Sequence, residues 1–102
     1  MTLSLLVAAA LALGSVAAHA GVDEAMNKAG CLACHAKDKK IVGPAFKDIA
    51  AKYKGQDVTA KLMEKVRKGG AGSFGPVPMA PSSVEKISDA DLKEAVELIL
   101  KS

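Results

Sequence analysis

The stretch Cys31-Leu32-Ala33-Cys34-His35 decides how this chain of 102 residues folds. It has the pattern C-x-x-C-H, which is the attachment motif of a c-type haem. Two thiols on one turn of backbone can form thioethers with vinyl groups on one edge of a porphyrin. His35 follows Cys34 directly, and histidine is a common proximal haem ligand. The stretch therefore predicts one covalent haem c, held by Cys31 and Cys34, with His35 bound to its iron.

Three haem-free interpretations of the cysteine pair remain open on these five residues alone. The pair could be a thiol–disulfide redox site, half of a zinc site or a structural disulfide. A redox site of the thioredoxin type needs a βαβ context, and no strand pattern is present. A zinc site needs two more ligands, but the chain has no other cysteine and its second histidine, His19, lies in a segment expected to be removed.

The composition allows one small domain and excludes a nucleic-acid binder. The chain has 14 basic and 11 acidic residues, a net charge of +3, and no arginine-rich patch. The only aromatic residues are Phe46, Tyr53 and Phe74. A domain of roughly 80 residues rarely builds a sufficient apolar core alone. A buried porphyrin would supply the missing volume, so the protein part is expected to contain an apolar cavity, lined by Cys31, Cys34, His35, Pro44, Leu62 and Met79.

Residues 1–20 are predicted to be a cleaved secretory signal peptide. Leu3 to Leu13 form an apolar run, and Ala18-His19-Ala20 is an A-x-A cleavage site. The run is too short to span a bilayer as a helix, although an uncleaved membrane anchor is the alternative. Cleavage after Ala20 would leave a domain of residues 21–102 in the periplasm, without stable membrane insertion.

The spacing of apolar residues predicts an all-α domain with four short helices and no strands. The helices are expected over residues 22–31, from Pro44 to Gly55, from the N-cap Asp57 to Gly69-Gly70, and after the N-cap Ser88. Asp91 completes a capping-box pattern with Ser88. The clearest inner face belongs to the last helix, with Leu92, Ala95, Val96, Ile99 and Leu100.

A second axial ligand is expected from residues 69–83, which hold four of the nine glycines and three of the four prolines. Met79 lies there between prolines that stiffen the backbone, as a weak thioether ligand requires. Met26 and Met63 fall on predicted helices and are assigned to packing, and no histidine other than His35 follows residue 20. Two alternatives remain: Met79 is only an apolar side chain in a turn, or the iron keeps an open site.

Together with the haem motif, the segments Val42–Ala50 and Gly75–Met79 resemble the short bacterial class I cytochromes c, with the cytochromes c-551 as the nearest type. The resemblance covers essentially all of residues 21–102. It implies a fold in which short helices wrap around one covalent haem. It also implies that the Pro44 carbonyl accepts a hydrogen bond from His35 Nδ1, and that Gly30 lets the first and last helices cross closely.

The same resemblance implies further contacts around the haem. A basic residue, Lys65 or Arg67, and the aromatic Phe74 are expected to meet a haem propionate. The type protein has tryptophan at the position of Phe74, and phenylalanine has no N–H to donate. Ser82 stands where the type has an asparagine near the methionine sulfur.

The expected function is the transfer of single electrons between respiratory redox partners, namely a reductase or oxidase and a cytochrome-type donor. With His35 and Met79 both bound to iron no site remains for a substrate, so no enzymatic activity is expected, and the carrier is expected to be a monomer. The alternatives are a ligand-binding haem sensor or peroxidase-like protein with an open iron, and a haem-free thiol oxidoreductase. Lysines could steer acidic partners or merely solubilise the surface; they are Lys28, Lys37, Lys39, Lys40, Lys47, Lys65 and Lys68.

Overall fold

The structure, a computed structural model, describes residues 16–102, and it describes side chains from residue 21 onward. Residues 1–15 of the expected signal peptide lie outside this part of the chain. The first helix, α1, spans Val16–Lys28 and continues across the expected cleavage point after Ala20, so the cleavage stays a prediction. Among the described residues, none of the helices has the length and apolar character needed to cross a membrane.

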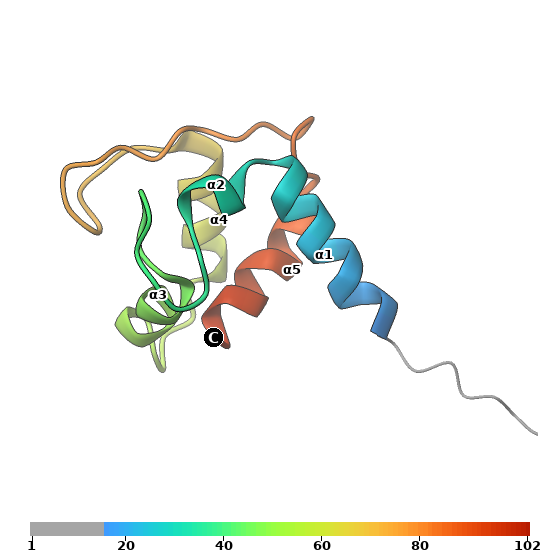
Figure 1. The fold of residues 1–102 in the computed structure, drawn as a ribbon, viewed down its shortest axis with the longest axis horizontal. Coiled ribbons are helices and arrows are strands. Elements are labelled where there is room, and N and C mark those ends of the chain that lie inside the picture. Colours follow the sequence, from blue (N-terminus) through green and yellow to red (C-terminus); the bar gives the residue numbers. More distant parts are fainter. Residues whose placement is uncertain (1–15) are drawn as a thin grey trace, which may run out of the picture.

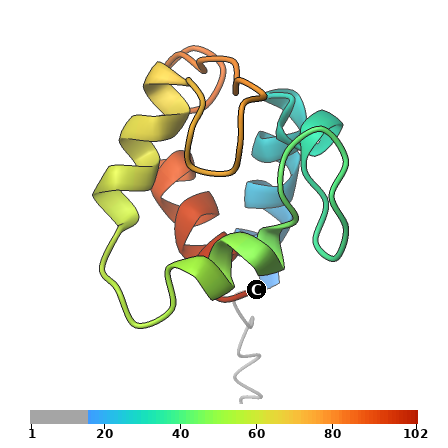
Figure 2. The same ribbon diagram turned by 90° about the vertical axis from the view of Figure 1, so that its left-hand side faces the viewer.

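Five helices and no strand form the regular structure of residues 16–102, which confirms the all-α prediction. After α1 come α2 (Cys31–Cys34), α3 (Phe46–Lys52), α4 (Thr59–Lys68) and α5 (Asp89–Leu100), as Figure 1 shows. Four of them correspond to the predicted helices, and α2 is an additional single turn. α5 packs against α1, α3 and α4, and in Figure 2 it lies between α4 on the left and α1 on the right.

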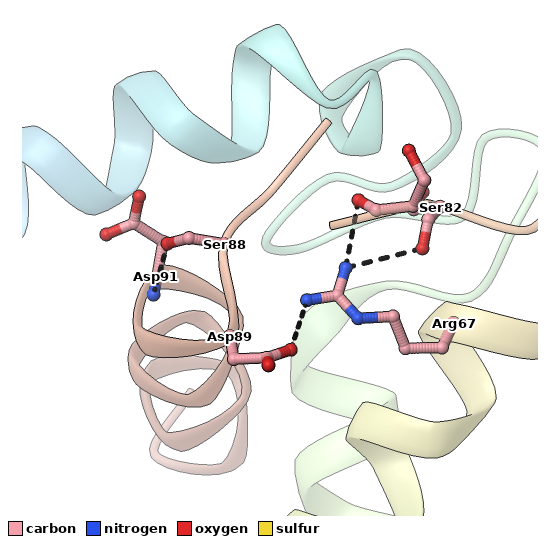
Figure 3. Close-up of polar contacts among 6 residues, drawn as sticks. Arg67, Ser82, Ser88, Asp89 and Asp91 are labelled. Carbon is pink, nitrogen blue, oxygen red and sulfur yellow. Dashed lines mark hydrogen bonds and ion pairs between the residues drawn. The ribbon is translucent and has the colours of Figure 1, made fainter. Parts of the chain in front are cut away.

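The central position of α5 follows from its apolar face. Leu92, Ala95 and Val96 are buried, in agreement with the predicted inner face. The helix begins where the Ser88 hydroxyl accepts a hydrogen bond from the Asp91 N–H at 3.2 Å, which confirms the predicted N-cap (Figure 3). A cap of this kind stabilises a helix by about 1 kcal/mol.

Two clusters of buried apolar side chains join the helices around α5. The first joins α1, α3 and α5, through Val22, Met26, Phe46 and Ala95. The second surrounds Ile87 at the start of α5 and includes the half-buried α4 residues Leu62, Met63 and Val66. Met26 and Met63 therefore pack in the core, as the sequence predicts.

The first helix is shorter at its C-terminal end than predicted. It ends at Lys28 instead of running into Cys31, because Gly30 has a left-handed φ of +82° between α1 and α2. A Cβ at Gly30 would meet no atom within 4 Å. The expectation that Gly30 permits a close helix crossing is therefore wrong, and the glycine is needed for its backbone angle.

Two predicted helix starts are also shifted. α3 begins at Phe46 and not at Pro44, whose carbonyl accepts a hydrogen bond from a side chain outside the helix. α4 has Val58 at its N-cap without any side-chain hydrogen bond, so the predicted Asp57 cap is wrong. Val58 is buried whereas Asp57 is exposed. Apolar packing at Val58 therefore sets the start of this helix.

Candidate functional site

A cavity of about 640 Å³ lies inside the ring of helices. Its lining includes every residue that the sequence predicts for it, namely Cys31, Cys34, His35, Pro44, Leu62 and Met79. Two stretches supply most of the chemistry: the histidine segment, residues 31–44, and the methionine segment, residues 69–83. In Figure 2 the methionine segment, drawn in gold to orange, lies between α4 and the turn that carries the cysteines. The volume falls within the roughly 300–1,000 Å³ that is typical of cofactor pockets.

The imidazole of His35 is held from several sides. Its Nδ1 lies 2.7 Å from the Pro44 carbonyl oxygen, as the resemblance implied. A carbonyl can only accept, so Nδ1 carries the hydrogen and the lone pair on Nε2 is left for a metal. The ring of Phe46 stacks on the imidazole with centroids 5.5 Å apart. The side chain is thus fixed in one orientation and one tautomer.

Gly43 brings the backbone against this imidazole. Its N–H donates to the Cys34 carbonyl at 2.7 Å, which closes the histidine segment into a loop. A Cβ at position 43 would lie 2.5 Å from Cε1 of His35. Only glycine therefore fits at this position while His35 keeps its place. Gly43 belongs to a segment that carries the resemblance, but nothing in the sequence predicts this contact.

The two cysteines lie half-buried on the single turn of α2, and both thiols are free. Burial raises the pKa of the Cys31 thiol, so its neutral form is favoured at neutral pH. Among residues 21–102, no group of three or more His, Cys, Asp or Glu side chains is arranged to hold a metal ion. In this part of the chain the cysteine pair therefore lacks the further ligands that a zinc site requires.

Met79 is joined to the end of α4 by backbone contacts. Gly70 and Met79 exchange two N–H···O hydrogen bonds, each 2.9 Å long. At Gly69, where φ is +67°, a Cβ would lie 2.4 Å from the Met79 carbonyl oxygen. These two glycines were predicted only as a helix stop. Gly69 also lets the methionine segment approach the end of α4 more closely than any other residue would allow.

Lys65 and Arg67, the two basic residues that could meet a haem propionate, lie in different surroundings. Lys65 lines the cavity. Arg67 does not; its Nη1 donates to the carbonyls of Ser82 at 3.3 Å and Ser83 at 3.0 Å. Its Nη2 lies 2.6 Å from the Asp89 carboxylate (Figure 3). Arg67 thus ties the end of the methionine segment to α5, and Lys65 is the basic residue that the geometry offers to the cavity.

Phe74 and Ser82 both line the cavity. Phe74 is 40% exposed, and the ammonium of Lys52 lies 4.5 Å from the centre of its ring. No local pattern in the sequence links Lys52 to a residue so far along the chain, so this contact was not predicted. Ser82 is buried, and its N–H donates to the Val66 carbonyl at 2.9 Å.

The lysines that could steer acidic partners differ in their ion pairs and in their position relative to the cavity. Lys28 and Lys68 pair with acidic residues of their own helices, at 3.8 Å and 2.7 Å. The ion pair with Glu64 raises the pKa of Lys68. Lys40 and Lys65 line the cavity, whereas Lys37, Lys39 and Lys47 are exposed away from it.

The chain is similar to known proteins over nearly all of its described length. The family model for cytochrome c matches residues 21–102. The chain is 50% identical over 80 residues to cytochrome c2 of Rubrivivax gelatinosus, covering 78% of this chain and 94% of that protein. It is 42% identical over 79 residues to cytochrome c-551 of Azotobacter vinelandii, covering 76% and 93%. The crystal structure of wild-type Nitrosomonas europaea cytochrome c552 matches with a TM-score of 0.68 at 41% identity, covering 78% of this chain and 96% of that one.

Proposed function

The chain belongs to the cytochrome c family, and from this premise we propose that it is a periplasmic carrier of single electrons with His/Met ligation of its haem. Its relatives are electron carriers and not enzymes. Family membership implies a covalent haem c and redox proteins as partners. The proposal adds three points: His35 and Met79 as the iron ligands, the periplasm as the compartment, and the cavity side with Lys40 and Lys65 as the partner surface.

The observation that carries the proposal is one cavity lined by Cys31, Cys34, His35 and Met79. The cysteines would hold the porphyrin edge through two thioethers. His35 would offer Nε2 to the iron, because Nδ1 is occupied by the Pro44 carbonyl. That hydrogen bond also makes the imidazole a more basic ligand.

Met79 would complete the iron's coordination. A thioether is a weak ligand, and the paired hydrogen bonds to Gly70 restrict its backbone before any ligation. When bound, haem c would supply a one-electron couple between ferric and ferrous iron. Ligation by methionine and histidine raises the reduction potential. With His35 and Met79 both holding the iron, no position would be left for a substrate, which suits a carrier.

Export is proposed from the N-terminal sequence. The apolar run and the A-x-A site of residues 1–20 are typical of a signal peptide. The match to the family begins at residue 21, directly after the proposed cleavage site. N-terminal sequencing of the purified periplasmic protein tests this, and a protein that retains residues 1–20 would contradict it.

The proposed partners are acidic redox proteins that approach the cavity side where Lys40 and Lys65 lie. Exposed charges steer association and are screened over about 10 Å at 0.1 M salt. Association rates with such a partner should therefore fall as salt rises. Rates that stay constant between low and high salt would remove this role from the lysines.

The central test is made on the native protein. Haem staining after denaturation should be positive because the attachment is covalent, and the ferric spectrum should contain a sulfur-to-iron charge-transfer band. A negative stain would favour the haem-free thiol oxidoreductase. A positive stain without the charge-transfer band would favour an open-site haem protein that binds ligands.

A further inference from the structure

The tip of the methionine segment, residues 71–78, lines the cavity on one side, and none of its residues is buried against the rest of the protein. Within residues 16–102, a single hydrogen bond joins this tip to the rest of the chain: Lys52 Nζ donates to the Ser73 carbonyl. The other backbone hydrogen bond of the tip is internal, from the Gly72 N–H to the Gly75 carbonyl at 3.0 Å. The tip therefore depends on a side chain from another helix for its position.

Lys52 lies in the last turn of α3, and its ammonium meets two aromatic rings besides this carbonyl. It lies 4.5 Å from the ring centre of Phe74 in the tip. It also lies 5.7 Å from the ring centre of Tyr53, which is 7% exposed and so fixed in the core. The Lys52 ammonium thus connects the buried Tyr53 ring at the end of α3 with the Phe74 ring and the Ser73 carbonyl in the tip.

These contacts distinguish Lys52 from a lysine that only solubilises the surface. A cation over an aromatic face at an exposed site biases an equilibrium roughly two- to five-fold. A hydrogen bond from a charged donor adds to this bias. Phe74 is five residues before Met79, and Gly70 fixes the backbone of Met79 from the other side. A tip that lifts from α3 would therefore pull directly on Met79.

We propose that Lys52 is a positioning residue, which holds the tip of the methionine segment against α3 and so keeps the Met79 sulfur bound to iron. This inference rests on the proposed function, in which Met79 is an axial ligand. Lys52 does not line the cavity and would act only through Ser73 and Phe74. It would set how often the sixth iron position opens.

The test uses the ferric holoprotein with imidazole as a competing ligand. Imidazole can bind the iron only after Met79 leaves, so the rate at which the charge-transfer band disappears reports opening of the methionine segment. Lys52→Met keeps the aliphatic stem and removes the ammonium. It should raise this rate roughly three- to ten-fold. Lys52→Arg, which keeps a cation and N–H donors, should restore the rate to within about two-fold of wild type.

Lys61→Met is the matched control. Lys61 Nζ lies 5.8 Å from the same Tyr53 ring, but no hydrogen bond or ring contact joins this lysine to the tip in the described structure. Its removal takes away the same charge and should leave the rate of imidazole binding within about two-fold of wild type. In a Phe74→Leu background the effect of Lys52→Met should shrink, because the two residues act as a pair.

The outcomes separate the two proposals. If wild-type protein shows the charge-transfer band and Lys52→Met binds imidazole no faster than Lys61→Met, the positioning role is wrong and the proposed function stands. If the wild-type band is absent, Met79 is not a ligand and both fail. A faster rate in Lys52→Met with an unchanged thermal midpoint supports positioning, since a general loss of stability would lower the midpoint as well.

Discussion

The histidine segment and the methionine segment line the same cavity but are held in place differently. The histidine segment is closed by its own hydrogen bonds, from His35 Nδ1 to Pro44 and from the Gly43 N–H to Cys34, each 2.7 Å long. The partners of these two bonds lie within residues 31–44, and α3, which follows directly, adds the N–H groups of Phe46 and Lys47, which donate to the carbonyls of Ala36 and Lys37. The methionine segment relies on other elements for its position: the end of α4 at its base, Arg67 at its far end and Lys52 at its tip.

This difference indicates which side of the site should open first. Closing a short loop costs little entropy, and neighbouring residues can keep their contacts while distant elements move. A segment whose tip is held by one exposed side chain, here Lys52, opens at a lower free energy than the core does. We therefore expect the His35 side to behave as a rigid support and the Met79 side to be the one that exchanges ligands.

The largest effect is expected from removing the covalent anchors of the histidine segment. The double change Cys31→Ala, Cys34→Ala should abolish attachment, because no other cysteine exists in the chain. Either single change should weaken attachment and leave one thioether. Haem staining after acid-acetone extraction measures this. If the doubly changed protein still retains haem, the assignment of the C-x-x-C-H motif is wrong.

The next largest effect is expected from removing the side chain of Met79, on the other side of the cavity. Met79→Ala should abolish the ferric charge-transfer band and lower the potential, since axial ligand identity spans roughly 0.8 V across haem proteins. Met26→Leu and Met63→Leu are matched controls in the core clusters. They should keep the band and cost at most about 1.5 kcal/mol as swaps of similar volume.

Spectra and redox titrations of all three variants make the comparison. A helical variant that loses the band would transfer the ligand role from Met79 to that methionine. Met79→Ala protein that keeps its band would make the open-site protein the better hypothesis.

A third prediction concerns Gly43 and Gly69, the two glycines at which the backbone lies close to His35 and to Met79. Gly43→Ala should force the His35 ring to move, and Gly69→Ala should push Met79 away from α4. Each should cost about 1–3 kcal/mol through overpacking, and the positive φ at Gly69 should add about 1–3 kcal/mol of backbone strain. Gly30→Ala is the control, because its φ is also positive but its Cβ would meet nothing within 4 Å. It should cost only about 1–2 kcal/mol.

Thermal melts and ferric spectra distinguish the three glycine variants. Gly69→Ala should lose the charge-transfer band before the protein unfolds, whereas Gly30→Ala should keep it up to the melting transition. If Gly69→Ala keeps both band and stability, the close approach at Met79 is not needed for ligation.

These glycines also show where prediction from sequence ends. Patterns within one element were predicted well, namely the inner face of α5 and the Ser88 cap. The residues expected around the cavity do line it, whereas their roles as ligands stay predictions. A glycine gives no indication of which distant atom approaches it, so the contact of Gly69 with Met79 could not be predicted. Periodicity also cannot show the break at Gly30, because helical spacing continues through it.

Long-range side-chain contacts set the second limit. Lys52 and Phe74 lie 22 positions apart, and nothing near either residue indicates their contact. Asp57 illustrates a local pattern that failed. Its polar side chain suited the N-cap of α4, but the buried residue Val58 next to it occupies that position. The choice between Lys65 and Arg67 likewise required knowing which of them faces the cavity.

The last and smallest prediction concerns these two basic residues. Arg67→Leu removes the hydrogen bonds to Ser82, Ser83 and Asp89 and should cost about 1–3 kcal/mol of stability. The charge-transfer band should remain, because Gly70 and Lys52 still hold the part of the segment that contains Met79. Lys65→Leu should do the opposite: a small change in stability, but a lower potential, because a positive charge at the cavity disfavours the ferric state.

Denaturant melts and redox titrations on both variants test this pair. The two variants lose the same charge, so a difference in potential between them reports position and not net charge. If Arg67→Leu lowers the potential while Lys65→Leu leaves it unchanged, Arg67 is the residue that meets the propionate. The methionine segment would then rearrange around the haem, and Arg67 would exchange its partners on α5 for the cofactor. Such a result would place the flexibility of this site at the far end of the segment as well as at its tip.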